Sequence, residues 1–259
     1  MIHRIINHII YSFYSTIWYL WNISLIKQYF DSNDITNYRV ELMHLWKPNA
    51  KYFSGYLIST NQKIFVKFGA KLFIQREYDA LQYLSALLPS ISWLPIIINY
   101  DLNWALPNIT FKFIDGIPLN KIDKNNISPV LQKNLITTFK EICNSLYPLG
   151  LAHRDIRPHN IIIDKDNSVY LIDFAFMVGT NKQYTSLQEL PNTPENIDKL
   201  YRLGNGYNPK IGIWDDAYSC MKILTEFGVD DSNLSQVSEF VGKLSIQMVE
   251  KKYASTKKI

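Results

Sequence analysis

Short segments in which apolar and polar residues alternate follow one another through residues 38–115. Such alternation, with many β-branched and aromatic residues, is typical of strands that bury one face. Two of these segments are separated only by the polar turn Thr60–Gln62, which predicts a hairpin. We expect a small antiparallel sheet, whose strands are 38–46, 51–59, 63–69, 93–101 and 108–115.

One segment within this β-rich half has helical spacing instead. Residues 71–88 carry large apolar side chains every three or four positions, and Pro89 ends the pattern. The first half is therefore expected to be a sheet with one main helix. The side chains predicted to form the buried face of that helix are Leu72, Ile74, Tyr78, Leu81, Leu84 and Leu88.

The second half is mostly helical in pattern. Ser128 followed by Pro129 is a typical helix start. A hairpin follows at 160–176, with its turn at Asp166–Asn167, and helical spacing returns from about residue 213. This order predicts an α+β fold of two lobes, with a hinge near 113–120 and the chemistry between the lobes. The expected domains are a helical extension at 1–37, an N-lobe at 38–116 and a C-lobe at 117–259.

The segment before the first predicted strand has no formally charged residue from His8 to Ile26. It is rich in tyrosine and tryptophan, which favour membrane interfaces, but polar residues interrupt it. Three alternatives remain open: a helix buried on the domain, a helix lying on a membrane surface, or a transmembrane span. Arg4 and Lys27 flank the segment and do not decide among them. No signal peptide is expected, because no small-residue cleavage site follows.

Composition excludes some classes of partner. The formal net charge of +4 is too small to indicate nucleic-acid binding. Cys143 and Cys220 fit neither a disulfide framework nor a metal site, and we expect both in helices as small hydrophobic residues. They favour a reducing compartment, so a cytoplasmic protein is expected, with peripheral contact to a membrane through residues 1–30 as a further possibility.

The octapeptide HRDIRPHN, residues 153–160, concentrates charged and amide side chains just before the predicted hairpin. It places Asp155 five positions before Asn160, and Asp173 follows at the far end of the hairpin. Any one of these residues has an ordinary structural interpretation, such as capping a turn. Their spacing instead favours a reaction site.

Two residues of the first half extend this pattern. Lys67 stands inside an apolar strand, and Glu77 lies ten positions further on, in the next helix. The order of strand lysine, helix glutamate, HRD loop, hairpin and DFA segment resembles the protein-kinase-like superfamily over about residues 38–220. The octapeptide matches the kinase pattern H-R-D-L-x-x-x-N position by position.

The resemblance implies an enzyme that uses ATP and Mg²⁺ to phosphorylate a hydroxyl. Phosphoryl transfer requires mainly positioning and neutralisation of charge. Lys67, held by Glu77, would supply a fixed cation for the nucleotide phosphates. Asn160 and Asp173 would offer oxygen ligands to Mg²⁺, and Asp155 would orient the acceptor hydroxyl and take its proton. The adenine is expected beside the backbone of Phe113, Ile114 and Asp115.

Other residues are assigned by the same resemblance. Arg157 stands where many kinases carry a lysine and would stabilise the transferring phosphoryl group. His153 is expected to hold the loop together rather than act as a second base. Asp216 occupies the position that anchors the catalytic loop, with Asp215 as the alternative. The segment Thr193–Glu195 resembles the kinase signature APE.

The chain also departs from the family. The expected glycine-rich nucleotide loop, around residues 46–55, retains only Gly55. Without glycine the backbone cannot approach phosphates as closely, so Lys47 and Lys51 are candidates to replace it with side-chain charge. Ala175 replaces the glycine of the kinase DFG segment.

These departures guide the expected acceptor. Few residues follow Asp216, fewer than protein kinases use to dock protein substrates. With the aromatic amino terminus, this is similar to bacterial lipopolysaccharide-core and capsule sugar kinases, which act at the cytoplasmic membrane face. We therefore expect a saccharide or other small hydroxyl acceptor, most simply a sugar of a lipid-linked glycan.

Two alternatives remain. The first is a small serine/threonine protein kinase in which Arg154 pairs with a phosphate on the segment that carries Thr180, Thr185, Ser186 and Thr193. The second is a pseudokinase that binds partners without catalysis. The missing glycines motivate the second alternative, but the retained Lys67, Asp155, Asn160 and Asp173 argue against it.

Overall fold

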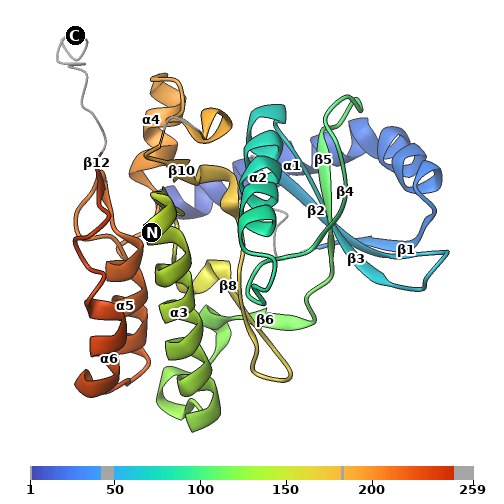
Figure 1. The fold of residues 1–259 in the computed structure, drawn as a ribbon. Helices are drawn as coiled ribbons and strands as arrows, with labels where there is room; N and C mark the ends of the chain where they lie inside the picture. The colour runs from blue at the N-terminus through green and yellow to red at the C-terminus, as the bar shows by residue number, and fades with distance from the viewer. Residues whose placement is uncertain (1, 42–49, 182–183, 248–259) are drawn as a thin grey trace, which may run out of the picture. The chain divides into compact units, whose positions relative to one another are not determined.

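The computed structural model of the chain describes residues 2–41, 50–181 and 184–247. It consists of two compact units, Met1–Asp115 and Gly116–Ile259. The first unit holds an antiparallel sheet with its helices, and the second is mostly helical (Figure 1). This confirms the predicted α+β fold with a sheet-based N-terminal lobe and a helical C-terminal lobe.

The sheet of the first unit has five strands in the order β1-β2-β3-β5-β4, and every neighbouring pair is antiparallel. The strands lie close to the predicted segments. The first begins three residues earlier than predicted, and the part of its predicted range from residue 42 lies outside the described residues. The bounds are β1 Ile35–Val40, β2 Ala50–Leu57, β3 Lys63–Gly69, β4 Ile97–Asp101 and β5 Asn108–Lys112.

Two helices cover the two faces of this sheet, α1 (Ile2–Ser32) and α2 (Lys71–Leu87). Successive residues of a strand point to opposite faces. On β3, Ile64, Val66 and Phe68 therefore join the core formed with α1. Lys67, between the last two, points to the face of α2. In Figure 1, α2 stands in front of the sheet and α1 runs behind it.

The carboxyl-terminal half of α1 is part of the core of the first unit. Ile26, Tyr29 and Phe30 are buried, and the Tyr29 hydroxyl is 3.1 Å from the Thr110 hydroxyl on β5. Of the three alternatives for this segment, the structure shows a helix packed on the domain along this half. Within the described residues, no helix combines the length and the apolar character needed to cross a membrane.

Helix α2 has nearly the predicted extent, and Ile74, Leu81 and Leu84 are buried as predicted. Leu72 is instead 44% exposed, and Tyr78 stacks on Tyr100 of β4 with ring centroids 3.5 Å apart. Two charged residues also face inward, and one of them, Glu77, pairs with Lys67. The buried residues of α2 are Ile74, Arg76, Glu77, Ala80, Leu81 and Leu84.

The second unit is built on the helices α3 (Pro129–Leu149), α5 (Asp216–Glu226) and α6 (Asp231–Ser238), which pack against one another. Ser128 caps α3 as predicted: its hydroxyl accepts a hydrogen bond from the Leu131 amide at 3.1 Å. Cys143 on α3 and Cys220 on α5 are buried free thiols, which confirms their predicted role.

The predicted hairpin is formed by β8 (Ile161–Asp164) and β9 (Val169–Leu171). A third strand, β6 (Gly116–Pro118), pairs with β8, although the sequence pattern predicted no strand there. Its pairing partner lies far away in sequence. The remaining elements are α4 Pro194–Tyr201, β7 Leu151–Ala152, β10 Val178–Gly179, β11 Ile213–Trp214 and β12 Ile246–Gln247, with 3-10 turns η2 Leu119–Lys121, η3 Lys124–Asn126, η4 Pro158–Asn160, η5 Phe174–Phe176 and η6 Thr185–Leu187.

Candidate active site

The HRD loop of the second unit runs from β7 to η4 and is anchored on the first residue of α5. The His153 amide donates to Asp216 Oδ2 at 2.6 Å, and the Arg154 amide donates to Asp216 Oδ1 at 3.0 Å. Asp215 has a different function, because it caps α5 by accepting from the Tyr218 amide. The prediction that Asp216, and not its neighbour, holds this loop is confirmed.

Arg154 adopts a left-handed backbone conformation, with φ +69°, and its side chain is buried. Its Nη1 lies 2.7 and 2.9 Å from the two carboxylate oxygens of Glu189, and its Nε donates to the Phe176 carbonyl. Its guanidinium carbon also lies 5.1 Å from the centre of the Trp214 ring. Arg154 is thus already paired with a carboxylate, whereas the protein-kinase alternative predicted a phosphate there.

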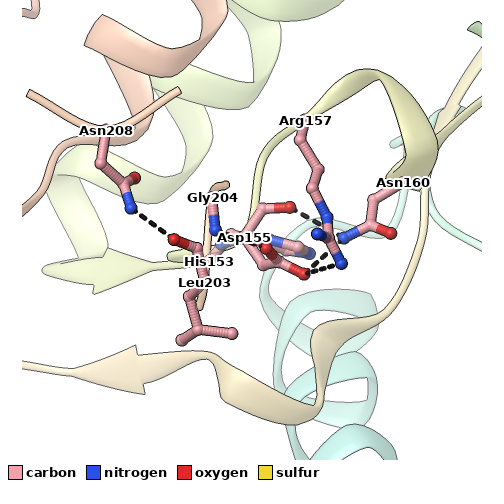
Figure 2. A network of polar contacts seen from close by, with 7 residues as sticks. All are labelled: His153, Asp155, Arg157, Asn160, Leu203, Gly204 and Asn208. Atoms are coloured by element: carbon pink, nitrogen blue, oxygen red, sulfur yellow. Dashed lines mark hydrogen bonds and ion pairs between the residues drawn. The ribbon is translucent and has the colours of Figure 1, made fainter. Parts of the chain in front are cut away.

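The carboxylate of Asp155 is held by donors on both of its oxygens (Figure 2). Oδ2 accepts from Asn160 Nδ2 at 2.7 Å and lies 3.2 Å from Arg157 Nη2. Oδ1 accepts from the Gly204 amide at 2.6 Å. Burial raises the pKa of the Asp155 carboxyl to about 6, while these three partners act to lower it. At neutral pH the group is therefore mostly ionised, as a proton acceptor must be.

His153 supports this loop from within. Its ring is fully buried, with its edge against the Phe174 ring, and its Nδ1 accepts from the Asp155 amide at 3.3 Å. Burial lowers the pKa of the imidazole to about 4, so it is neutral at physiological pH. A neutral, enclosed imidazole suits a structural role rather than proton transfer with a substrate.

Asn160 and Asp173 are brought together by the hairpin that separates them in sequence. Ile161 pairs with Leu171, and the Ile172 amide donates to the Asn160 carbonyl at 2.9 Å. Asp173 has φ +69°, a strained value for a residue other than glycine. Asn160 Nδ2 donates a hydrogen bond to Asp155 Oδ2, so the amide oxygen of Asn160 points away from Asp155 (Figure 2).

The side chains of Asn160 and Asp173 suit Mg²⁺ better than a metal ion that is coordinated by protein side chains alone. They offer hard oxygen ligands, and the described residues contain no cluster of three His, Cys, Asp or Glu side chains able to hold a metal ion. Mg²⁺ is usually held by one or two carboxylates together with substrate phosphates and water. The donor set therefore fits an ion that arrives with a nucleotide.

The first unit provides the predicted cation. Lys67 Nζ on β3 lies 2.7 Å from Glu77 Oε2 on α2, and their side chains are only 8% and 3% exposed. Asp79, another acidic residue of α2, accepts a hydrogen bond from Gln75 Nε2. A flexible lysine stem is thus held in one position within the first unit, facing α2.

The segment predicted to meet adenine follows β5. The Phe113 amide donates to the Lys63 carbonyl at 3.1 Å, and Lys63 Nζ lies 3.6 Å from the centre of the Phe113 ring. That amide is therefore engaged within the sheet. Ile114 and Asp115 complete the segment, whose role toward adenine stays a prediction.

Lys51 and Gly55, two residues of the expected nucleotide loop, have structural functions. Lys51 Nζ donates to the Ser15 hydroxyl on α1 at 2.8 Å, on the face of the sheet opposite to Lys67. Lys51 therefore does not replace the loop, and that hypothesis was wrong for this residue; Lys47 lies outside the described residues. A Cβ on Gly55 would lie 2.8 Å from Ile35 Cγ2, so this glycine allows β1 to pack on β2.

The segment after the hairpin is fixed by local contacts. Ala175 lies in the turn η5, and the Thr180 hydroxyl donates to the Gly150 carbonyl at 3.0 Å. Thr193, the first residue of the APE-like triplet, caps α4 by accepting from the Asn196 amide. Glu189 and Gly204 were missed by the sequence analysis, because neither belongs to a motif and both reach the loop through tertiary contacts.

The fold and these residues are those of a protein-kinase-like protein. The profile of the RIO domain, a protein-kinase-like family, matches residues 51–206, well over half of the chain. The chain belongs to this family. The matched range includes the Lys67–Glu77 pair, the HRD loop, the hairpin and Gly204.

Several curated proteins are similar over part of the chain. The serine/threonine-protein kinase PknB of Mycolicibacterium smegmatis is 33% identical over 121 residues, which cover 39% of this chain and 19% of that protein. The probable serine/threonine-protein kinase glkA of Dictyostelium discoideum is 25% identical over 142 residues, 55% of this chain and 30% of the relative. The chain spans less than a third of the length of these relatives.

These similarities support the predicted kinase class, in which ATP and Mg²⁺ are the cofactors. They favour the serine/threonine-kinase alternative over the sugar kinase that the sequence analysis preferred. The resemblance to lipopolysaccharide and capsule enzymes is confirmed only at the level of the superfamily.

The first prediction concerns the buried guanidinium. Replacing Glu189 with alanine should lower the free energy of unfolding by about 1–3 kcal/mol, because Arg154 would lose the partner of a buried charge. Chemical denaturation of both proteins measures the difference. Glu195→Ala is the matched control: Glu195 is 76% exposed in its ion pair with Lys199 and should cost less than about 0.5 kcal/mol. Equal losses in the two variants would contradict the prediction.

Proposed function

We propose that the protein is an ATP- and Mg²⁺-dependent kinase that phosphorylates serine or threonine hydroxyls of proteins. The observation that carries the proposal is the Asp155 carboxylate, which is buried, ionised at neutral pH and held by donors on both oxygens. The proposed acceptor follows from the relatives, which are named serine/threonine-protein kinases. A sugar acceptor, preferred from the sequence alone, becomes the rival.

In the proposed reaction, Asp155 accepts a hydrogen bond from the acceptor hydroxyl and takes its proton as the oxygen attacks the γ-phosphorus. The oxygen–phosphorus bond forms while the bond between the γ-phosphorus and the leaving ADP oxygen breaks. Arg157, paired with Asp155 Oδ2, would face the developing charge. Asn160 and Asp173 would hold Mg²⁺, which when bound neutralises phosphate charge, and Lys67 would bind phosphate oxygens.

The activating phosphate that many protein kinases require has a substitute in this chain. Arg154, the residue that would pair with such a phosphate, contacts both oxygens of Glu189 instead. This ion pair gives Arg154 an acidic partner without modification of the segment. We therefore propose a kinase whose turnover does not depend on prior phosphorylation of Thr180, Thr185, Ser186 or Thr193.

The roles of the two charged residues can be separated. Asp155→Ala should lower turnover at least about 100-fold while leaving nucleotide affinity nearly unchanged, because it removes only the proton acceptor. Lys67→Ala should weaken ATP binding about tenfold or more, because it removes a charge-assisted contact to phosphate. Steady-state kinetics and calorimetric titration with Mg-ATP measure the two effects. Lys71→Ala, an exposed lysine at the start of α2, should change neither. Wild-type turnover in Asp155→Ala would refute the assigned base.

The acceptor is identified by incubating the protein and a fractionated lysate with ATP labelled at the γ-phosphate. We expect label on serine or threonine in the protein fraction, and none when Asp155→Ala replaces the wild type. Label in the lipid-linked glycan fraction would overturn the protein acceptor in favour of the sugar kinase. Mg-ATP binding without any labelled fraction would favour the pseudokinase.

A membrane contact through α1 is a second proposal, carried by the outer face of that helix. Large apolar side chains there are 42–82% exposed. Tyrosine and tryptophan favour the lipid headgroup region. Arg4 and Lys27 give this segment positive charge, and no acidic residue precedes Asp31, so an anionic membrane surface is the complementary partner. The exposed side chains are Ile10, Phe13, Tyr14, Leu20, Trp21 and Ile23.

Sedimentation with vesicles tests this contact. The protein should sediment with vesicles of mixed phosphatidylglycerol and phosphatidylcholine more than with phosphatidylcholine alone. The double variant Phe13→Ser, Trp21→Ser should lose most of this binding, because two of the three exposed aromatic side chains of α1 are gone. Ile58→Ser, a control at a 64% exposed position outside α1, should bind like the wild type. Wild-type binding by the double variant, or a stable dimer that hides this face, would overturn the proposal.

A further inference from the structure

The loop that follows α4 reaches the predicted base from a distant part of the chain. The Gly204 amide donates to Asp155 Oδ1 at 2.6 Å, although the two residues are 49 positions apart. We propose that Gly204 is a positioning residue, whose backbone N–H fixes the Asp155 carboxylate for phosphoryl transfer, and that Asn208 fixes this N–H in turn. This deepens the proposed function and rests on it.

The hydrogen-bond donors around the Asp155 carboxylate restrict its rotation. Asn160 Nδ2 and Arg157 Nη2 both approach Oδ2, and the Gly204 amide approaches Oδ1 (Figure 2). Donors on one oxygen alone would leave the group able to turn about its Cβ–Cγ bond. With donors on both oxygens, that rotation is resisted. Each carboxylate oxygen offers about two acceptor sites, so the group retains capacity to accept a substrate proton.

A single peptide unit links Asn208 to Asp155. The N–H of Gly204 and the C=O of Leu203 belong to the same planar peptide, and they point in opposite directions in the trans form. Asn208 Nδ2 donates to the Leu203 carbonyl at 2.7 Å, while the Gly204 N–H donates to Asp155 at the other end (Figure 2). Asn208 therefore sets the orientation of this peptide and, through it, of the donor. Hydrogen bonds joined in this way also polarise one another.

The backbone conformation of Gly204 and the atoms around it explain why glycine stands at this position. Gly204 has φ +70°, which favours glycine, and an added Cβ would lie 2.4–2.5 Å from the amide atoms of Asn208. A side chain here would therefore push Asn208 away from the Leu203 carbonyl. The glycine allows the asparagine to sit against the peptide that it orients.

The test compares two alanine variants with the same backbone strain. Gly204→Ala should lower kcat about 10- to 100-fold, because a small displacement of a reacting group costs this much, while KM for ATP stays unchanged. Gly228→Ala is the matched control: Gly228 also has φ +70°, and an added Cβ would meet nothing closer than Gln132 Nε2 at 4.0 Å. Its kcat should stay within about twofold of the wild type, at a similar melting temperature to a folded Gly204→Ala.

A second variant keeps the test decisive if Gly204→Ala fails to fold. Asn208→Ala leaves Gly204 in place and removes only the group that orients its peptide. It should lower kcat several-fold without changing KM for ATP, whereas a merely structural role would lower stability alone. If Asn208→Ala, and Gly204→Ala where it folds, turn over within twofold of Gly228→Ala while the wild type is active, the positioning role is wrong.

Hydrogen exchange of the Gly204 amide tests the contact without any activity. The amide should be protected in the wild type and should exchange markedly faster in Asp155→Ala, because its acceptor is gone. Equal exchange in the two proteins would overturn the contact itself. An inactive wild type with the expected exchange difference would instead overturn the proposed function, so the two failures are distinguishable.

Discussion

The two backbone hydrogen bonds from the HRD loop to Asp216 are the contact on which the site of the second unit depends. The loop is buried, and buried amides need partners. Asp216 lies in the first turn of α5, where the helix dipole favours a carboxylate, although burial raises its pKa to about 6. By binding consecutive amides, Asp216 fixes the left-handed backbone of Arg154 and thereby the direction of Asp155, which follows it. The pairing of Arg154 with Glu189 and the placement of Asp155 are both consequences.

In the first unit the comparable constraint is the alternation of side chains across the sheet. Tyr52 on β2 is paired with Lys67 on β3, so Lys51 must face the opposite side. The lysine that faces α2 meets Glu77, and the lysine that faces α1 meets Ser15. Both lysines lie in apolar strands, and a slip of either strand by one residue would turn its lysine to the other face. This is why the sequence predicted the Lys67–Glu77 pair from its motif yet misassigned Lys51.

The features that the sequence predicted well are local ones. The strands β2 and β3, the helices α2 and α3, the cap of Ser128 and the hairpin around Asn167 all arise from neighbouring residues. The spacing from Asp155 to Asn160 also acts locally, since one side chain binds the other. The pairing of β6 with β8 depends on a distant strand. Periodicity within a segment carries no information about such a partner, so this pairing could not be predicted.

The two residues of the site that were not predicted, Glu189 and Gly204, lie in stretches for which the sequence pattern predicts no regular element. Within a regular helix each amide beyond the first turn donates to the carbonyl four residues earlier, and within a central strand it donates to a neighbouring strand. Neither arrangement leaves an N–H for a side chain elsewhere. The turn after α4 leaves such an N–H available. Gly204 takes a backbone conformation there that interrupts the helical pattern and directs its N–H to Asp155. An irregular segment is therefore the kind of backbone that can supply a donor to a buried carboxylate.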